Sequence, residues 1–284
     1  MSWNAHFPDA GRPIRITDSG MATVRGHSPP PVFDGWLQAL EERHLADLRI
    51  PEVTRALRAL SSVYVERRRD GGLQKALDGA GKRAAFALFY GPLHFITTYS
   101  IVQALGSRAV GSSAGARRIL DLGCGTGAAG AAWALAADCA AVTGLDRHPW
   151  AVAEARWTYG ALGLHGSARR DDLTRMPAIG AGDAVLAAFL LNELAEAARV
   201  TLFHQLLEGA RRGAQVLIVE PISLRVSPWW RAAAAEVEAA GGRADEWRFS
   251  VDLPERVRLL DKAAGLDHRE LTARSLYCPG SRGG

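Results

Sequence analysis

The spacing of apolar residues divides the chain into two halves. Before residue 106, apolar side chains recur at helical intervals, as in the series Val53, Leu57, Leu60 and Tyr64. Pro51 suits the first turn of that helix, because a backbone N–H would have no partner there. The pattern predicts helices at residues 37–48, 51–70, 82–90 and 92–105, the second of which stops at Gly71 and Gly72.

After residue 115, short apolar runs alternate with amphipathic stretches. The predicted strands are residues 118–122, 141–145, 168–170, 184–189, 215–220 and 268–272. The predicted helices are residues 127–137, 149–161, 192–210, 228–240 and 254–264. This alternation is typical of βαβ units, which place their strands in parallel. The chain is therefore predicted to be an α/β protein with a Rossmann-like, doubly wound, mostly parallel sheet and an N-terminal helical region.

Three regions follow from these patterns. Residues 1–33 are rich in proline and glycine without sustained periodicity, so they are predicted to form a poorly ordered arm. Residues 34–110 form the helical N-terminal region, which would serve as a lid or as a docking surface. Glycine and serine are frequent in residues 106–115, as in a linker. Residues 115–280 form the α/β domain.

Composition and charge change this picture little. The chain has 284 residues, of which 48% are hydrophobic and 23% are charged, as in ordinary globular proteins. The net charge is +4, and all of the excess lies before residue 116. Such a bias is either a solvated surface or a docking face for an anionic partner such as RNA.

Cysteine usage and hydropathy argue against several classes of protein. Cys124, Cys139 and Cys278 are odd in number and include no Cys-x-x-Cys pair, which argues against a disulfide framework and against a metal site. This usage suits a reducing compartment, so a cytoplasmic location is expected. The sequence contains no run of 18 apolar residues, so neither a membrane span nor a membrane partner is expected.

The most specific chemical signal is the segment RILDLGCGTG at residues 118–127. An apolar strand carries Asp121 near its end, and Gly123, Gly125 and Gly127 follow at alternate positions. Side chains there would keep a ligand away from the backbone as the chain turns from strand into helix. The loop also fits the G-x-G-x-x-G dinucleotide pattern. The carboxylate of Asp121 favours S-adenosylmethionine instead, because it would attract the amino end of that cofactor and repel a pyrophosphate.

Acidic residues also follow the second and third predicted strands. Asp146 comes about 20 residues after the glycines, where a carboxylate can accept hydrogen bonds from both ribose hydroxyls. Its alternative role is to cap the helix that opens at Pro149. Asp172 can accept a hydrogen bond from an adenine amino group while Leu173 packs on the ring. The alternative for these two residues is a surface turn.

Together, the motifs DLGCGTG, GLD and DDL-x-x-x-P and the strand over 183–189 resemble the class I S-adenosylmethionine-dependent methyltransferases, over roughly residues 115–278. The resemblance implies a methyltransferase with S-adenosyl-L-methionine as its cofactor. The cofactor-binding residues that it implies are Asp121, Gly123, Cys124, Gly125, Gly127, Asp146, Arg147, Asp172, Leu173 and Phe189.

The acceptor of the methyl group is less clear from the sequence. Asn192 and Glu193 follow the fourth strand of the α/β domain, where they would face the methyl group or the acceptor. They would equally serve as the cap and first turn of the next helix. Glu220 and His94 are further candidates for a general base, although His94 lies in an apolar stretch typical of a core histidine. The N-P-P-Y signature of enzymes that methylate planar nitrogens is absent.

A second resemblance concerns the mitochondrial small-ribosomal-subunit methyltransferase-like assembly factors and their bacterial relatives. It rests on Leu190–Leu194, Val216–Pro221 and the helical stretch Arg83–Leu105. It implies ribosomal RNA or a ribosomal component as the partner, contacted by the basic N-terminal region. Members often carry a cysteine cluster after the fifth strand, where this chain has only Cys278, so no metal or iron–sulfur cluster is expected.

Three functions therefore stay open. The first is a methyltransferase that acts on RNA or a ribosomal component. The second is a small-molecule methyltransferase with the helical region as a lid, in which Tyr90, Tyr99, Trp229 and Trp230 would line an apolar pocket. These tryptophans would otherwise be core residues. The third is a cofactor-binding assembly factor without catalysis.

Overall fold

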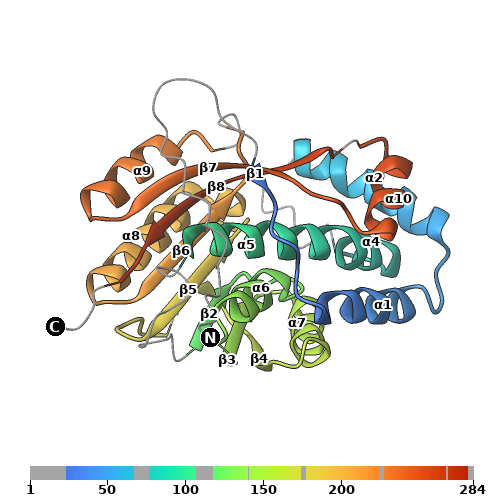
Figure 1. The fold of residues 1–284 in the computed structure, drawn as a ribbon, viewed down its shortest axis with the longest axis horizontal. Helices are drawn as coiled ribbons and strands as arrows, with labels where there is room; N and C mark the ends of the chain where they lie inside the picture. The colour runs from blue at the N-terminus through green and yellow to red at the C-terminus, as the bar shows by residue number, and fades with distance from the viewer. Residues whose placement is uncertain are drawn as a thin grey trace, which may run out of the picture.

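The structure, a computed structural model, describes residues 24–66, 77–106, 118–139, 141–173, 177–223, 227–266 and 268–280. Its centre is an eight-stranded sheet with the order β1-β7-β8-β6-β5-β2-β3-β4 (Figure 1). Only β8 is antiparallel to its neighbours, β6 and β7. The described strands are β1 (Val24–Arg25), β2 (Arg118–Leu122), β3 (Ala141–Asp146), β4 (His165–Arg170), β5 (Asp183–Ala188), β6 (Gln215–Glu220), β7 (Arg243–Ser250) and β8 (Glu270–Cys278).

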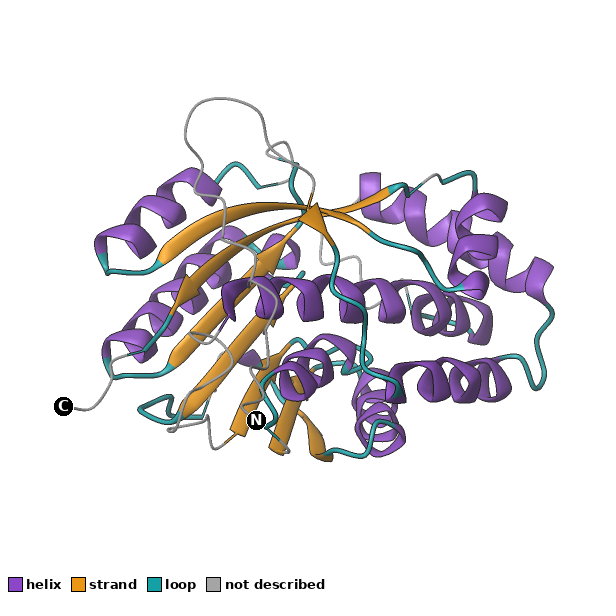
Figure 2. Cartoon of the chain, viewed as in Figure 1, coloured by secondary structure: helices purple, strands orange, loops and turns teal. Residues whose placement is uncertain are grey.

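Helices lie on both sides of this sheet (Figure 2). Three segments, α4, η1 and α5, are continuous and form one rod over residues 80–105, with a π-helical turn, η1, in its middle. The described helices are α1 (Val32–His44), α2 (Ile50–Glu66), α4 (Ala80–Ala85), η1 (Phe86–Tyr90), α5 (Gly91–Leu105), α6 (Ala128–Ala136), α7 (Pro149–Ala161), η4 (Leu191–Glu193), α8 (Glu196–Arg211), α9 (Trp230–Ala239) and α10 (Glu255–Ala264).

Alternate residues of the central strands face two different hydrophobic clusters. In β5, Ala184 and Leu186 face the cluster that contains α5, α6 and α7, and Val185 and Ala187 face the cluster that contains α8 and α9. This follows from the two-residue period of a strand whose two faces are both covered. The strand order reverses between β2 and β5, so a crevice is expected beyond the carboxyl ends of these two strands.

The N-terminal helices share the first of these clusters with the α/β domain. Trp36 of α1, Leu57 of α2 and Phe95 of α5 are buried together with α6 residues such as Trp133. Within the described residues, the rod 80–105 is the one helix long and apolar enough to cross a membrane, and 83% of its most apolar window is buried inside the protein. The rod is therefore a core helix of this fold.

The predicted α/β fold is confirmed, but the sequence pattern missed one strand. Residues 243–250 form β7, which pairs with β8 along its whole length. Charged residues alternate there with Trp247 and Phe249, and they form cross-strand ion pairs such as Arg274–Glu246 and Arg248–Glu270. Because these ion pairs make the strand polar, its period-2 pattern is hard to recognise. The last strand, predicted at residues 268–272, is β8 at residues 270–278.

Other boundaries also differ from the sequence pattern. Val24 and Arg25 of the predicted arm form the short edge strand β1, which pairs with β7, and α1 begins at Val32. The helix predicted from residue 192 begins at Glu196, because η4 comes first. Residues 1–23 of the predicted arm and 107–115 of the predicted linker lie outside the described residues.

Candidate functional site

The loop between β2 and α6 has the conformation that its glycines suggest. Gly123, Gly125 and Gly127 have φ angles of 61°, 52° and 77°, a region that L side chains rarely adopt. A Cβ on Gly123 would lie 2.5 Å from Leu190 Cδ1, and one on Gly127 would lie 2.8 Å from Tyr159 Cε1. The loop therefore presents bare backbone at the start of α6, as a nucleoside cofactor requires.

Asp121 belongs to β2, two positions before Gly123, and it is buried. Its Oδ2 accepts a hydrogen bond from the Gly130 N–H at 3.1 Å. Burial raises the pKa of Asp121 to about 7, and the nearby charge of Asp146 raises it further, against the opposing effect of the Gly130 hydrogen bond. Because the acid lacks a cationic partner among the described residues, a bound ammonium group would stabilise its charged form.

Asp146, at the end of β3, faces the same loop. Its Oδ2 accepts from the Gly125 N–H at 3.0 Å, and its Oδ1 accepts from the His148 N–H at 2.8 Å. His148 is the N-cap of α7, because its Nδ1 accepts from the Trp150 N–H at 3.2 Å. Asp146 is thus not that helix's cap, and its carboxylate is held at the rim of the glycine loop, where a ribose would pass.

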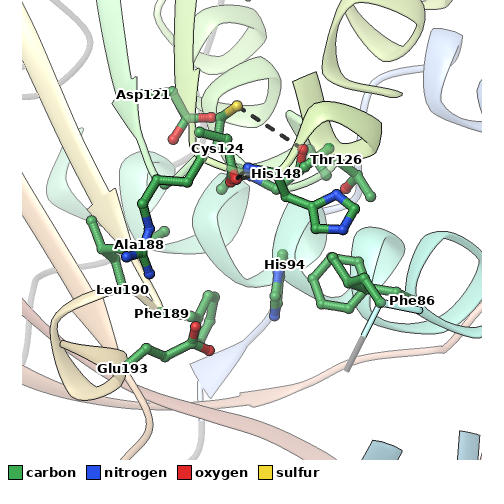
Figure 3. Close-up of a pocket in the computed structure, with 18 of the residues that line it drawn as sticks. Phe86, His94, Asp121, Cys124, Thr126, His148, Ala188, Phe189, Leu190 and Glu193 are labelled. Carbon is green, nitrogen blue, oxygen red and sulfur yellow. Dashed lines mark hydrogen bonds between the residues drawn. The ribbon is translucent and has the colours of Figure 1, made fainter. Parts of the chain in front are cut away.

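A cavity lies beyond the carboxyl ends of β2 and β5 (Figure 3). Gly127, Asp172 and Asn192 are not among the residues that line it. Gly127 packs against Tyr159 and Ala155, and Asp172 is exposed. The predicted residues that do line the cavity are Asp121, Gly123, Cys124, Gly125, Asp146, Arg147, Leu173, Phe189 and Glu193.

The N-terminal rod provides a second wall of the cavity, which includes Phe86 and His94. A Cβ on Gly125 would lie 3.5 Å from the Phe86 ring, and one on Gly91 would lie 3.3 Å from the Thr126 Oγ1. The rod therefore lies beside the glycine loop, with little more room between them than one methyl group would fill. Figure 3 shows the His94 ring between the side chains of Phe189 and Phe86.

The acceptor candidates occupy different environments. Asn192 is buried, its Nδ2 donates to Glu220 Oε2 at 2.6 Å and to Ser227 Oγ at 2.8 Å, and its Oδ1 accepts from Trp229 Nε1 at 2.9 Å. Asn192 and Glu220 therefore fix the loop after β5 and do not face the cavity. Glu193 lines the cavity.

The paired tryptophans and the tyrosines do not line the cavity. Trp230 is buried and Trp229 packs against the same cluster, as the core interpretation expected. The hydroxyl oxygens of Tyr90 and Ser61 lie 3.2 Å apart, and the ring of Tyr99 stacks on that of Phe95.

Several lining residues were not predicted to lie there. They come from the N-terminal region, from the glycine loop, from the turn between β3 and α7 and from the segment after β5. For some of them the sequence contained one signal, the apolar character of segments 86–95 and 188–194. That signal predicts burial, but it does not distinguish a core residue from one that lines a cavity. The main ones are Leu77, Phe86, Thr126, His148, Leu190 and Leu194.

Comparison with known proteins agrees with this geometry. Residues 119–213 match the family model described as a methyltransferase domain. No curated protein is similar to this chain in sequence at a significant level.

Among solved structures, the methyltransferase domain of a bacterial Hen1 is 15% identical, with a TM-score of 0.46, and the match covers 66% of this chain and 99% of that one. Magnesium protoporphyrin IX methyltransferase from Synechocystis PCC 6803, with bound S-adenosylhomocysteine, is 16% identical with a TM-score of 0.42, over 65% and 82% of the chains. An O-methyltransferase from neocarzinostatin biosynthesis is 15% identical with a TM-score of 0.43, over 76% and 59%.

Within the α/β fold, residues 119–213 therefore match a methyltransferase domain. The chain is therefore an enzyme of methyl transfer, and its methyl donor is S-adenosylmethionine. The bare glycine backbone, the buried Asp121 and the rim carboxylate of Asp146 fit the amino end and the ribose of that donor.

Proposed function

We propose that this methyltransferase acts on a small molecule that binds between the glycine loop and the rod 80–105. The position of Phe86 carries this proposal, because its ring lines the cavity and would lie 3.5 Å from a Cβ on Gly125, which places an aromatic wall beside the donor site. The rod is buried over most of its length, so it cannot move aside without exposing core residues such as Phe95 and Ile101. The width of the cavity is therefore fixed by the core.

The chemistry of the cavity opposite the glycine loop also supports a small apolar acceptor. Phe189, Leu190 and Leu194 line it, together with the carboxylate of Glu193. The described lining holds the carboxyl groups of Asp121, Asp146 and Glu193 against the single guanidinium of Arg147, and this balance disfavours a phosphate group and hence a nucleotide within a nucleic acid chain. An RNA or ribosomal acceptor, as the second sequence resemblance implies, is the main competing outcome.

Labelling with tritiated S-adenosylmethionine tests the proposal. Total RNA, total protein and the deproteinised small molecules of the source cells are each incubated with purified protein. We expect label in the small-molecule fraction, and none with a Gly123→Ala variant, which should not bind the donor. Label that accumulates in RNA or protein would overturn the proposed acceptor class while leaving methyl transfer intact.

A further inference from the structure

His94 is the polar group that the rod contributes to the cavity, and it is held between aromatic rings. Its ring stacks on Phe189 with centroids 4.2 Å apart and an angle of 16° between the planes. The Phe86 ring meets it edge-on at 6.1 Å. Within the described part of the chain, the imidazole nitrogens of His94 make no hydrogen bond, and the residue is only half-buried. The imidazole is thus available to a bound molecule.

Two irregular backbone features bring these rings together. Phe189 has a φ of 57°, a conformation that costs a non-glycine residue on the order of 1–3 kcal/mol and that clusters at ligand sites. The π-helical turn at Phe86–Tyr90 adds one residue to the rod. Phe86 and His94 are eight positions apart in the sequence. Because the π-helical turn takes up one extra residue, this separation corresponds to about two full helical turns, which places both residues on the same side of the rod. Both side chains therefore reach the same cavity.

Burial lowers the pKa of His94 to about 4, so the ring is neutral at physiological pH. A neutral imidazole has one nitrogen lone pair that can accept a hydrogen bond, and it does not repel a sulfonium cation. Flat rings on either side favour a planar aromatic ligand, since offset and edge-on aromatic contacts are attractive. A hydroxyl on that ligand would satisfy the lone pair.

Resting on the function proposed above, we propose that the acceptor is a one- or two-ring phenol and that His94 binds its hydroxyl and takes up its proton. S-adenosylmethionine supplies the methyl group: a lone pair of the phenol oxygen forms the new C–O bond as the C–S bond breaks and its electron pair stays on sulfur. The hydroxyl proton passes to His94 and then to water. The reacting groups carry one positive charge throughout, first on the sulfonium and then on the imidazolium, until His94 releases the proton to water.

Binding without turnover is the first test. Phenol, catechol and 1-naphthol are titrated by calorimetry into full-length protein saturated with S-adenosylhomocysteine. The His94→Phe variant keeps an aromatic ring beside Phe189 but lacks both nitrogens. We expect it to weaken binding of the best phenol at least 10-fold, to leave S-adenosylhomocysteine affinity within 2-fold, and to leave binding of 1-methoxynaphthalene, which has no hydroxyl proton, unchanged. His204→Gln, at an exposed histidine of α8, is the matched control.

Turnover separates the possible failures. For the phenol that binds, kcat of His94→Phe should fall roughly 10²- to 10⁴-fold, the range for loss of a general base. Equal binding and turnover by His94→Phe and the wild type would overturn the role of His94. Binding of S-adenosylhomocysteine without binding of any phenol would overturn the acceptor class alone. Absence of S-adenosylhomocysteine binding would overturn the proposed function as well.

Discussion

The two walls of the cavity are built in different ways. The donor wall, formed by the loop after β2 and by Asp146, depends on backbone conformation and on carboxylates placed at strand ends. The wall from the rod 80–105 depends on the rings of Phe86 and His94, which line the cavity beside that loop. The first wall tolerates almost no substitution, whereas the second can change its side chains while keeping its contact. We therefore expect the donor wall to govern cofactor affinity and the rod wall to govern the acceptor.

The largest effect is expected at Gly123. Gly123→Ala would place a methyl group 2.5 Å from the Leu190 side chain, at a φ of 61° that alanine disfavours. We expect S-adenosylhomocysteine affinity, measured by calorimetry, to fall more than about 100-fold, because the loop must shift to relieve the overlap. Gly163→Ala is the matched control, since Gly163 also has a positive φ of 71° but nothing within 4 Å of its added Cβ. Similar losses in both variants would mean that backbone strain alone matters.

The next effect in size concerns Asp146. Its carboxylate holds the Gly125 and His148 amides, and it would accept the ribose hydroxyls. Asp146→Asn should reduce S-adenosylhomocysteine affinity about 10- to 100-fold, as charge-assisted hydrogen bonds become neutral or are lost. Asp172→Asn, at the exposed residue predicted to contact adenine, should change affinity less than about 2-fold, because Asp172 does not line the cavity. A large loss in Asp172→Asn would restore the sequence-based role.

The two walls also differ in how well the sequence predicts them. The glycines of the donor wall are required at fixed spacing by one local turn, so the motif at residues 118–127 predicts them directly. Phe86 and His94 lie far from that motif in the chain, and an apolar helix gives the same pattern whether or not it borders a ligand. The π-helical turn that aligns them has no sequence signature. Asn192 was ambiguous for the same reason, since a residue after a strand can face a ligand or fix its own loop.

A smaller effect should appear in the pH dependence of cofactor binding. Asp121 has a pKa raised to about 7, with Asp146, Cys124 and Tyr159 as the titratable neighbours around it. Only the ionised acid attracts the ammonium group of the cofactor. S-adenosylhomocysteine affinity should therefore rise about 10-fold between pH 6 and pH 8, as the ionised fraction rises. Asp121→Asn should bind weakly at both values, and an unchanged slope in that variant would assign the titration to another group.

Ionisation of Asp121 should also change the stability of the protein without cofactor. Because the folded pKa of Asp121 lies above its model-compound value of 3.8, the native state binds more protons than the unfolded state between about pH 4 and pH 7. The contribution of Asp121 to stability is thus present at low pH and is lost as the pH rises through about 7. Urea unfolding at pH 5 and pH 8 should show a smaller difference for Asp121→Asn than for the wild type.

The smallest effect on the cofactor is expected from the attachment of α1 to α7. Glu154 is buried on α7, and it accepts from Arg43 Nε at 3.2 Å and contacts His44 Nε2 at 2.6 Å. Glu154→Gln should lower the free energy of unfolding by about 1–3 kcal/mol, because two charge-assisted contacts of a buried carboxylate are weakened. Glu236→Gln, in an exposed pair, should cost less than about 0.5 kcal/mol.

Cofactor affinity in Glu154→Gln should stay within about 2-fold of the wild type, since no residue of α1 lines the cavity. Were affinity to fall in step with stability, the N-terminal helices would be shaping the donor wall as well. The assignment of cofactor affinity to the donor wall alone would then be wrong, because α1 contacts the rod in a shared core and does not itself line the cavity. If acceptor binding were lost while cofactor affinity stayed unchanged, the two walls would be shown to act separately, and the rod would be shown to need α1 to hold its position.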